Sequence, residues 1–268
     1  MRLKITFKLP ASKQVLPLNY QYPLSSWIYR VLGKGDREFS AFLHEHGYRQ
    51  GNNKTFKLFT FSNLQFPDKM WRIIKGTDRM EIFSGTAQII LSFQIPVAAE
   101  KFVAGLFKDQ YAEIGDRISN VKMEVSTIEM LQQPEFSETM RFSALSPIVI
   151  TQLTEKNKHE QYLKPGEINY EQLFFKNLID KHNAYERSVD VQAPLFTVEN
   201  LKLTCLTNNP QSRLQTIKAH TNEEVKVRGY LFDFEITAPP ALIKTGYESG
   251  FGAMNALGFG CGEVKSNN

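Results

Sequence analysis

The order of strand-like and helix-like segments is the feature that most limits what this chain can fold into. Residues 3–9 alternate in polarity as a strand does, and residues 24–32 place apolar side chains at helical spacing. The first half continues with strand-like segments at 56–62, 80–83 and 88–95, a helix at 97–107 after Pro96, and a strand at 121–131. The order β-α-β-β-α-β is that of a ferredoxin-like unit.

The second half repeats this order more loosely. Its predicted strands and strand candidates are 139–144, 149–154, 161–164, 201–207, 213–219, 225–236 and 259–264, and its predicted helices are 169–184 and 241–247. We therefore predict an α+β protein of two tandem ferredoxin-like domains, one at residues 1–134 and one at 135–268.

A second, short helix is expected directly after the first. Gly33 and Gly35 predict that the helix at 24–32 ends there, and Asp36 is placed to act as the next N-cap. The helix that follows, at 37–44, is expected to turn three apolar side chains inward: Phe39, Phe42 and Leu43.

Composition narrows the class of protein. Of 268 residues, only two are cysteines, Cys205 and Cys261, which excludes a disulfide framework and a cysteine zinc site. The same count is typical of a reducing cytoplasm, so we expect a cytoplasmic protein. The longest uncharged run, 82–99, contains Gln88, Gln94 and Pro96 and is interpreted as a strand leading into a helix, so we predict no membrane segment.

The charge is unevenly distributed. The formal net charge is +4, but residues 1–134 hold 18 Lys and Arg against 12 Asp and Glu, whereas the remainder holds 14 against 16. An excess of positive charge on the first half favours a polyanionic partner.

A glycine-rich stretch follows the last predicted helix. Residues 246–262 contain six of the sixteen glycines, interleaved with Phe251, Leu257 and Phe259 and with a single charge, Glu248. Large apolar residues exclude a flexible linker. Two interpretations remain open on composition alone: a tight turn into a final buried strand, or a loop whose backbone N–H groups contact phosphates.

A predicted hairpin around residue 222 carries several positive charges. Its cations are Arg213, Lys218, Lys226 and Arg228. A two-stranded basic ribbon can contact nucleic-acid phosphates. The simpler alternative is a solvated sheet face, which these residues alone favour.

No pattern in the sequence predicts a metal or cofactor site. The five histidines are His44, His46, His159, His182 and His220, and none lies in a His-Glu-x-x-His pattern or near a cysteine. The glycine stretch lacks Gly-Lys-Ser/Thr, and Asn255 stands where the dinucleotide fingerprint needs its last glycine. We expect neither a metal nor a cofactor.

Several segments, in order along nearly the whole chain, resemble the CRISPR-associated protein 6 family of the RAMP superfamily, endoribonucleases that cut precursor CRISPR RNA at each repeat. They are Met-Arg-Leu-Lys-Ile-Thr-Phe at 1–7, the helix around Tyr29, Leu-His-Glu at 43–45, Lys-Leu-Phe-Thr-Phe-Ser at 57–62 and Leu-Ser-Pro at 145–147. The most specific is Gly-Tyr-x-x-Gly-Phe-Gly-x-x-Asn-x-Leu-Gly-Phe-Gly at 246–260, which is similar to the family's signature loop. The family has two ferredoxin-like domains, as the pattern above predicts.

The resemblance implies a catalytic site. The family's histidine falls on His44, its tyrosine on Tyr29 and its lysine on Lys57, with His46 as a second candidate for the histidine. The implied reaction is a metal-independent attack of a ribose 2′-OH on the adjacent phosphorus, giving a 2′,3′-cyclic phosphate and a 5′-OH. The RNA-binding candidates are Arg213, Lys218, Lys226, Arg228, Gly246, Gly250, Gly252, Gly258 and Gly260.

The implied partner is CRISPR repeat RNA, and a homodimer or attachment to effector-complex subunits stays open. One alternative is a non-catalytic RNA-binding subunit of the same superfamily, since a fold does not establish an activity. Another is a ferredoxin-like module for protein assembly, in which the glycine stretch is purely structural.

Overall fold

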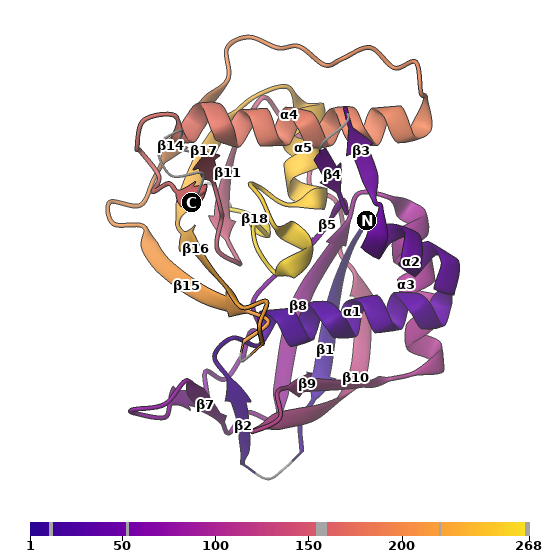
Figure 1. The fold of residues 1–268 in the computed structure, drawn as a ribbon, viewed down its shortest axis with the longest axis vertical. Helices are drawn as coiled ribbons and strands as arrows, with labels where there is room; N and C mark the ends of the chain where they lie inside the picture. The colour runs from indigo at the N-terminus through magenta and orange to yellow at the C-terminus, as the bar shows by residue number, and fades with distance from the viewer. Residues whose placement is uncertain (11–12, 52–53, 154–159, 220, 266–268) are drawn as a thin grey trace.

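Two larger antiparallel sheets with helices packed on them form the body of the protein, shown in Figure 1 as a computed structural model. The structure describes residues 1–10, 13–51, 54–153, 160–219 and 221–265. Two of the five histidines, His159 and His220, lie outside this part of the chain.

The first sheet has the ferredoxin-like order with one strand added at its edge. Its strands run β5 (Phe59–Phe61), β8 (Thr86–Phe93), β1 (Arg2–Lys8), β10 (Asn120–Met130) and β9 (Tyr111–Gly115). Helix α1 (Gln21–Gly35) follows β1 and helix α3 (Pro96–Lys108) follows β8. In chain order, β1, β5, β8 and β10 are the first to fourth strands of the unit. Read from β10 and without β9, the sheet order is therefore fourth, first, third, second, as the βαββαβ pattern predicts.

The second sheet repeats that order. Its strands run β14 (Lys202–Cys205), β17 (Asp233–Thr237), β11 (Thr139–Ala144) and β18 (Gly262–Val264). Helix α4 (Tyr170–Val189) lies between β11 and β14 in the chain, and α5 (Pro240–Ser249) lies between β17 and β18. The fold prediction of two ferredoxin-like units is confirmed, whereas the boundary at residue 134 stays a prediction.

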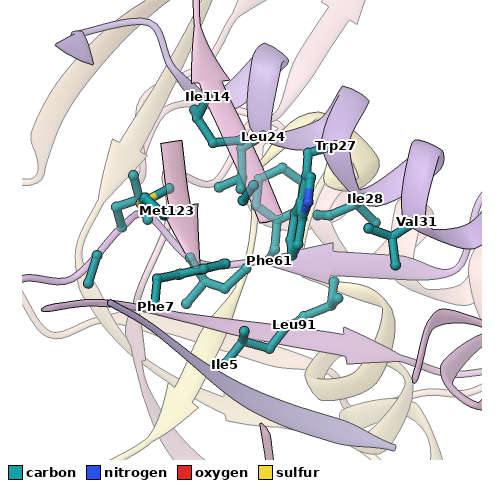
Figure 2. Close-up of a cluster of buried hydrophobic side chains, with 14 of the residues drawn as sticks. Ile5, Phe7, Leu24, Trp27, Ile28, Val31, Phe61, Leu91, Ile114 and Met123 are labelled. Atoms are coloured by element: carbon teal, nitrogen blue, oxygen red, sulfur yellow. The ribbon is translucent and has the colours of Figure 1, made fainter. Parts of the chain in front are cut away.

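Each sheet buries its own core. In the first, Ile5 and Phe7 of β1 meet Leu24, Trp27 and Ile28 of α1, whose apolar residues recur at helical spacing (Figure 2). In the second, Phe251 of the glycine stretch stacks on Phe174 of α4, with ring centroids 5.9 Å apart. The glycine stretch therefore contributes directly to the second core.

The remaining elements are insertions between the strands of the two units. They are α2 (Arg37–Glu45) and the pairs or small sheets β2 (Gln14–Pro17) with β7 (Arg79–Ile82) and β6 (Trp71–Ile73), β3 (Tyr48–Gln50) with β4 (Lys54–Phe56), β12 (Thr151–Leu153) with β13 (Glu160–Tyr162), and β15 (Gln211–Ile217) with β16 (Val225–Leu231). A 3₁₀ turn, η1 (Asn255–Leu257), precedes β18.

Local details correct the predicted boundaries around α1 and α2. Gly33 does not end the first helix, because α1 continues through Gly35 and packs against α3. Asp36 is the N-cap of α2 as predicted, and its side chain accepts from the Phe39 amide. Of the three side chains expected to face inward, Leu43 is fully buried, but Phe42 is 39% exposed.

Two predicted strands are divided in the structure. The segment 56–62 is broken at Leu58, whose φ is +51°, so that β4 ends before β5 begins. The segment 225–236 is two strands in different sheets, β16 and β17, separated by Phe232. The predicted closing strand, 259–264, is confined to β18 because residues 259–261 belong to the packed glycine stretch. Among the described residues, no helix is both long and apolar enough to cross a membrane.

Candidate active site

Tyr29 and His44 come together from two different helices. Tyr29 lies on α1 and His44 in the last turn of α2, and their rings meet edge to face with centroids 5.2 Å apart. Tyr29 also packs against Phe59 of β5, at 5.6 Å. The imidazole is exposed, whereas the phenol is half-buried between it and the sheet. Residues 15 positions apart in sequence thus form one polar cluster at the surface.

Lys57 joins this cluster because of the chain break before β5. It lies between β4 and β5, next to Leu58 with its positive φ, and its ammonium donates to the backbone oxygen of His44 (Nζ–O distance 2.7 Å). That oxygen belongs to the last turn of α2, where the helix dipole favours a cation. The structure thus brings together the three predicted catalytic residues, which we call the His44 cluster: Tyr29, His44 and Lys57.

Burial shifts two of these groups in opposite directions. It raises the pKa of the Tyr29 hydroxyl well above its ordinary value, so the phenol stays protonated and can donate a hydrogen bond. It lowers the pKa of the Lys57 ammonium from its ordinary value. The cluster therefore combines a neutral donor, a cation and an imidazole, the group whose ordinary pKa lies nearest to neutrality.

His46, the second candidate, lies apart from the cluster. It is the C-cap of α2, its side chain is 58% exposed, and its Nε2 lies 4.0 Å from the Glu45 carboxylate. In the part of the chain that the structure describes, the Tyr29 ring packs on His44 and Phe59 and not on His46. The geometry favours His44.

The predicted RNA-binding glycines are buried. The amides of three of the five have partners inside the protein: Gly250 donates to Gly246 O, Gly258 to Asn255 O and Gly260 to Pro147 O. A Cβ on Gly246 would lie 2.2 Å from the Phe251 ring, and one on Gly252 would lie 2.5 Å from Val149 O. Close packing therefore explains why glycine stands at these positions. Phosphate binding by their amides stays a prediction.

Gly260 provides a test of that structural role. It has φ +76°, and a Cβ there would lie 1.9 Å from the backbone oxygen of Phe251. We expect Gly260→Ala to destabilise the protein by about 3 kcal/mol or more, because it adds a backbone clash to an unfavourable φ. Urea unfolding measures the free energy.

The matched control for this change is Gly76→Ala. Gly76 has nearly the same φ, +79°, and no atom within 4 Å of an added Cβ, so the substitution should cost only about 1 kcal/mol. Equal losses at the two positions would contradict the packing role assigned to Gly260.

The predicted basic ribbon forms, but its cations do not share one face. Arg228 pairs with Leu214 and Lys226 with Thr216, whereas Arg213 pairs with Gly229. Since paired residues share a face and neighbours along a strand alternate, Arg213 points to the face opposite Lys226 and Arg228. Lys218 lies beyond β15 and forms an ion pair with Glu223. The ribbon thus presents Lys226 and Arg228 together.

Two family models match the chain. The family model described as "CRISPR associated protein Cas6, C-terminal" matches residues 131–264, and "CRISPR-associated protein Cas6, N-terminal" matches residues 15–129. The chain belongs to the Cas6 family.

Two curated relatives of this chain are named Cas6 endoribonucleases. The chain is 29% identical to CRISPR-associated endoribonuclease Cas6 1 of Methanocaldococcus jannaschii, over 92% of this chain and 86% of the relative. It is 27% identical to CRISPR-associated endoribonuclease Cas6 of Pyrococcus furiosus, over 94% and 84%. A solved structure described as CRISPR associated protein Cas6 is 26% identical, covers 99% of both chains and superimposes with a TM-score of 0.73.

This Cas6 chain also has a cleft that sequence patterns did not predict. It has a volume of about 520 Å³ and is lined by Lys57, by α4 and by residues 253–256 of the glycine stretch. Leu173, Asn177 and Lys181 of α4 recur every four residues and so share one helix face. From this four-residue spacing, the sequence could have predicted that the three residues share a helix face, but not that the face lines a cleft.

The other histidine that the structure describes has a structural environment. His182 is buried on α4, with Nδ1 3.0 Å from the Thr245 hydroxyl, and burial lowers its pKa. Among the described residues of this Cas6 protein, no three His, Cys, Asp or Glu side chains gather in a way that could hold a metal ion.

Proposed function

We propose that this protein is a metal-independent endoribonuclease that cleaves precursor CRISPR RNA within its repeats. The observation that carries the proposal is the His44 cluster, in which the Tyr29 ring packs on the His44 imidazole and the Lys57 ammonium binds the His44 backbone oxygen. Two similar proteins are named CRISPR-associated endoribonucleases, which supports the substrate class. We place the reaction in the cytoplasm, since a chain with only two cysteines is typical of a reducing compartment.

The residue types of the cluster suffice for the chemistry. The ribose 2′-OH attacks the adjacent phosphorus, and the 5′ oxygen of the next nucleotide leaves with a proton. His44 takes the 2′-OH proton as base or supplies the proton of the 5′ oxygen as acid, and solvent water carries out the other transfer, so that no net proton is consumed. The Lys57 ammonium stabilises the charge on the non-bridging oxygens, and the Tyr29 hydroxyl donates to the nucleophile or the leaving group. The products are a 2′,3′-cyclic phosphate and a 5′-OH.

The test is incubation of purified protein with repeat RNA in the presence of EDTA, followed by mapping of both ends. We expect a single cut with the two ends named above. A strict requirement for added magnesium, or a 3′-OH with a 5′-phosphate, would overturn the proposed mechanism.

Lys57 is expected to set the alkaline limit of the reaction. The ammonium acts only when protonated, and because burial lowers its pKa, its charge is lost at a lower pH than for a free lysine. Arginine stays protonated throughout, so Lys57→Arg should reduce the maximum rate but move the fall in rate to higher pH. Single-turnover rates from pH 6 to 10 measure this shift. An unchanged alkaline limit would remove Lys57 from this role.

The two cations on one face of the ribbon are expected to contact RNA phosphates. Replacing both Lys226 and Arg228 by Gln should reduce the slope of log K against log salt by about 1.4, since each single-strand phosphate contact contributes about 0.7. Filter binding from 50 to 300 mM KCl measures the slope. The charge-matched control is Lys108→Gln with Lys122→Gln, on α3 and β10, where the slope should not change.

A second candidate is a repeat-RNA-binding subunit without cleavage activity, held in a larger effector complex. It is favoured by the names of two similar proteins, each an "endoribonuclease-like" Cas6 protein and each 26% identical to this chain. Tight, salt-sensitive binding of repeat RNA without any cleavage under the conditions above would select this alternative.

A further inference from the structure

Strand β6 forms one edge of the small sheet that it makes with β7 and β2. This sheet lies at the lower end of the molecule in Figure 1, away from α2. On one side β6 pairs with β7, and in the described part of the chain no strand pairs with its other side. An open edge of this kind presents unpaired backbone groups to any extended chain that reaches it.

The pairing with β7 fixes which backbone groups of β6 remain free. The Phe83 amide donates to Met70 O at 2.9 Å, and the Ile74 amide donates to Arg79 O at 3.0 Å. The even-numbered residues of this segment therefore point their backbone groups toward β7. Since successive residues of an antiparallel strand alternate in direction, Ile73 points its N–H and C=O away from the sheet. These two groups are placed to pair with one residue of an added strand.

Large apolar side chains remain exposed at this edge. Trp71 is 44% exposed and Ile73 is 56% exposed. They pair with Ile82 and Met80 of β7, which are buried in the first core, and paired residues share a face of the sheet. The apolar surface that faces the core therefore continues out to the edge of the sheet, where an added strand would bury it.

The charges along the edge determine what kind of strand fits. Residues 69–75 contain Lys69, Arg72 and Lys75 and no acidic residue. Arg72 is paired with Glu81 of β7, whereas the exposed Lys69 and Lys75 form no ion pair with any residue that the structure describes. Antiparallel pairing of two copies of β6 about Arg72 would place Lys69 of one copy opposite Lys75 of the other. An acidic strand avoids this repulsion between like charges.

We propose that β6 is a docking edge for an extended acidic segment of another protein, which adds a strand to this sheet. Backbone hydrogen bonds to Ile73 hold the segment, its apolar side chains cover Trp71 and Ile73, and its carboxylates face Lys69 and Lys75. Strand addition takes its affinity from main-chain hydrogen bonds and its specificity from alternate side chains. No residue of the His44 cluster takes part, so the inference does not depend on the proposed nuclease activity.

A peptide strand fits this edge better than RNA does. RNA phosphates would contact the two lysines, and a base could stack on Trp71. Neither contact uses the aliphatic side chain of Ile73 or its outward backbone groups. A peptide strand uses all of these features together.

The probe for the test is the peptide Glu-Thr-Ile-Glu-Val-Thr-Glu with blocked ends, whose glutamates match the three cations in either strand direction. Binding is measured by the fluorescence of Trp71, since the chain's other tryptophan, Trp27, is fully buried. We expect the peptide to move the emission to shorter wavelength and to saturate below about 1 mM. A peptide with lysine in place of each glutamate should cause no shift.

The variant Ile73→Pro tests the backbone contact. Proline removes the outward N–H without removing a bond to β7, and an edge strand accepts it at such a position. We expect the acidic peptide to bind this variant about tenfold more weakly, whereas the matched control Ile73→Val, which keeps the N–H, should change binding less than about twofold. Unchanged Trp71 emission before the peptide is added shows that the strand is intact.

A charge reversal tests the lysines without altering the backbone. The double variant Lys69→Glu with Lys75→Glu should lose the shift with the acidic peptide. It should instead show the shift with Lys-Thr-Ile-Glu-Val-Thr-Lys, in which only the end charges are reversed.

The absence of a shift with the acidic peptide, equal binding by Ile73→Pro and Ile73→Val, or an unchanged preference in the charge-reversed variant would each overturn the docking edge. Two further outcomes would also overturn it. Repeat RNA that shifts the Trp71 emission and displaces the peptide would make this edge an RNA contact. A dimer of the free protein that Ile73→Pro dissociates, measured by sedimentation, would assign the edge to a second copy of the chain.

Discussion

A repeat RNA with a 2′-deoxynucleotide immediately upstream of the cut is expected to bind this protein as the all-ribose RNA does and to remain uncleaved. The proposed nucleophile is the 2′ oxygen itself, so its removal leaves His44, Tyr29 and Lys57 without a reaction to catalyse. Binding persists because one hydroxyl contributes little against the phosphate contacts. Single-turnover cleavage and filter binding on the same RNA separate the two effects.

The control for this experiment is a deoxynucleotide one position further upstream. It removes a 2′-OH from the neighbouring nucleotide and leaves the proposed nucleophile in place. That RNA should be cut at close to the normal rate. Cleavage of the first RNA would show that water attacks the phosphorus, and the assignment of the His44 cluster to 2′-OH chemistry would then be abandoned.

The second large effect is expected at His44. Replacing His44 by Ala should slow single-turnover cleavage by about 10²–10⁴-fold, the usual contribution of a positioned acid or base, with RNA affinity nearly unchanged. The structure provides the reason, since the His44 ring lies against Tyr29 and its backbone oxygen binds Lys57. Because that backbone oxygen remains in the variant, the position of Lys57 should be preserved.

His46→Ala is the matched control, since it removes the same side chain two residues further along the same helix end. His46 is 58% exposed and its nearest described ionic group is Glu45, so its loss should reduce the rate only a few-fold. The opposite ranking of the two variants would transfer the catalytic role to His46.

The order of elements was predictable from sequence because it depends on local periodicity. The apolar spacing of α1, α3 and α4 and the alternation of β1 are visible in the sequence, and together they predict two ferredoxin-like units. Where the prediction was wrong, a tertiary contact overrides a local signal. Gly33 continues a helix because α1 packs on α3. The segment 56–62 breaks at Leu58, where its apolar residues change from even to odd positions.

The candidate site, too, was predictable from the sequence only in part. Resemblance to a family placed Tyr29, His44 and Lys57, and the structure shows that they lie together. The cleft lined by Lys57 and α4 was not predicted. It forms because α4 packs against β3 and β4, more than a hundred residues earlier, and because Lys181 donates to the backbone oxygens of Gly250 and Gly252. The basic hairpin was visible, but the opposite orientation of Arg213 depends on its strand register.

The contacts of the glycine stretch with the first half have a consequence for cooperativity. Arg2 donates to Gly262 O at 2.7 Å, Ser25 to Ala256 O at 2.6 Å and Thr60 to Phe259 O at 3.0 Å. The same stretch supplies Phe251 to the second core. Unfolding of either half would therefore break contacts that the other half makes with the glycine stretch. Heating should therefore melt both halves in one calorimetric transition, and an RNA that binds either half stabilises the whole molecule.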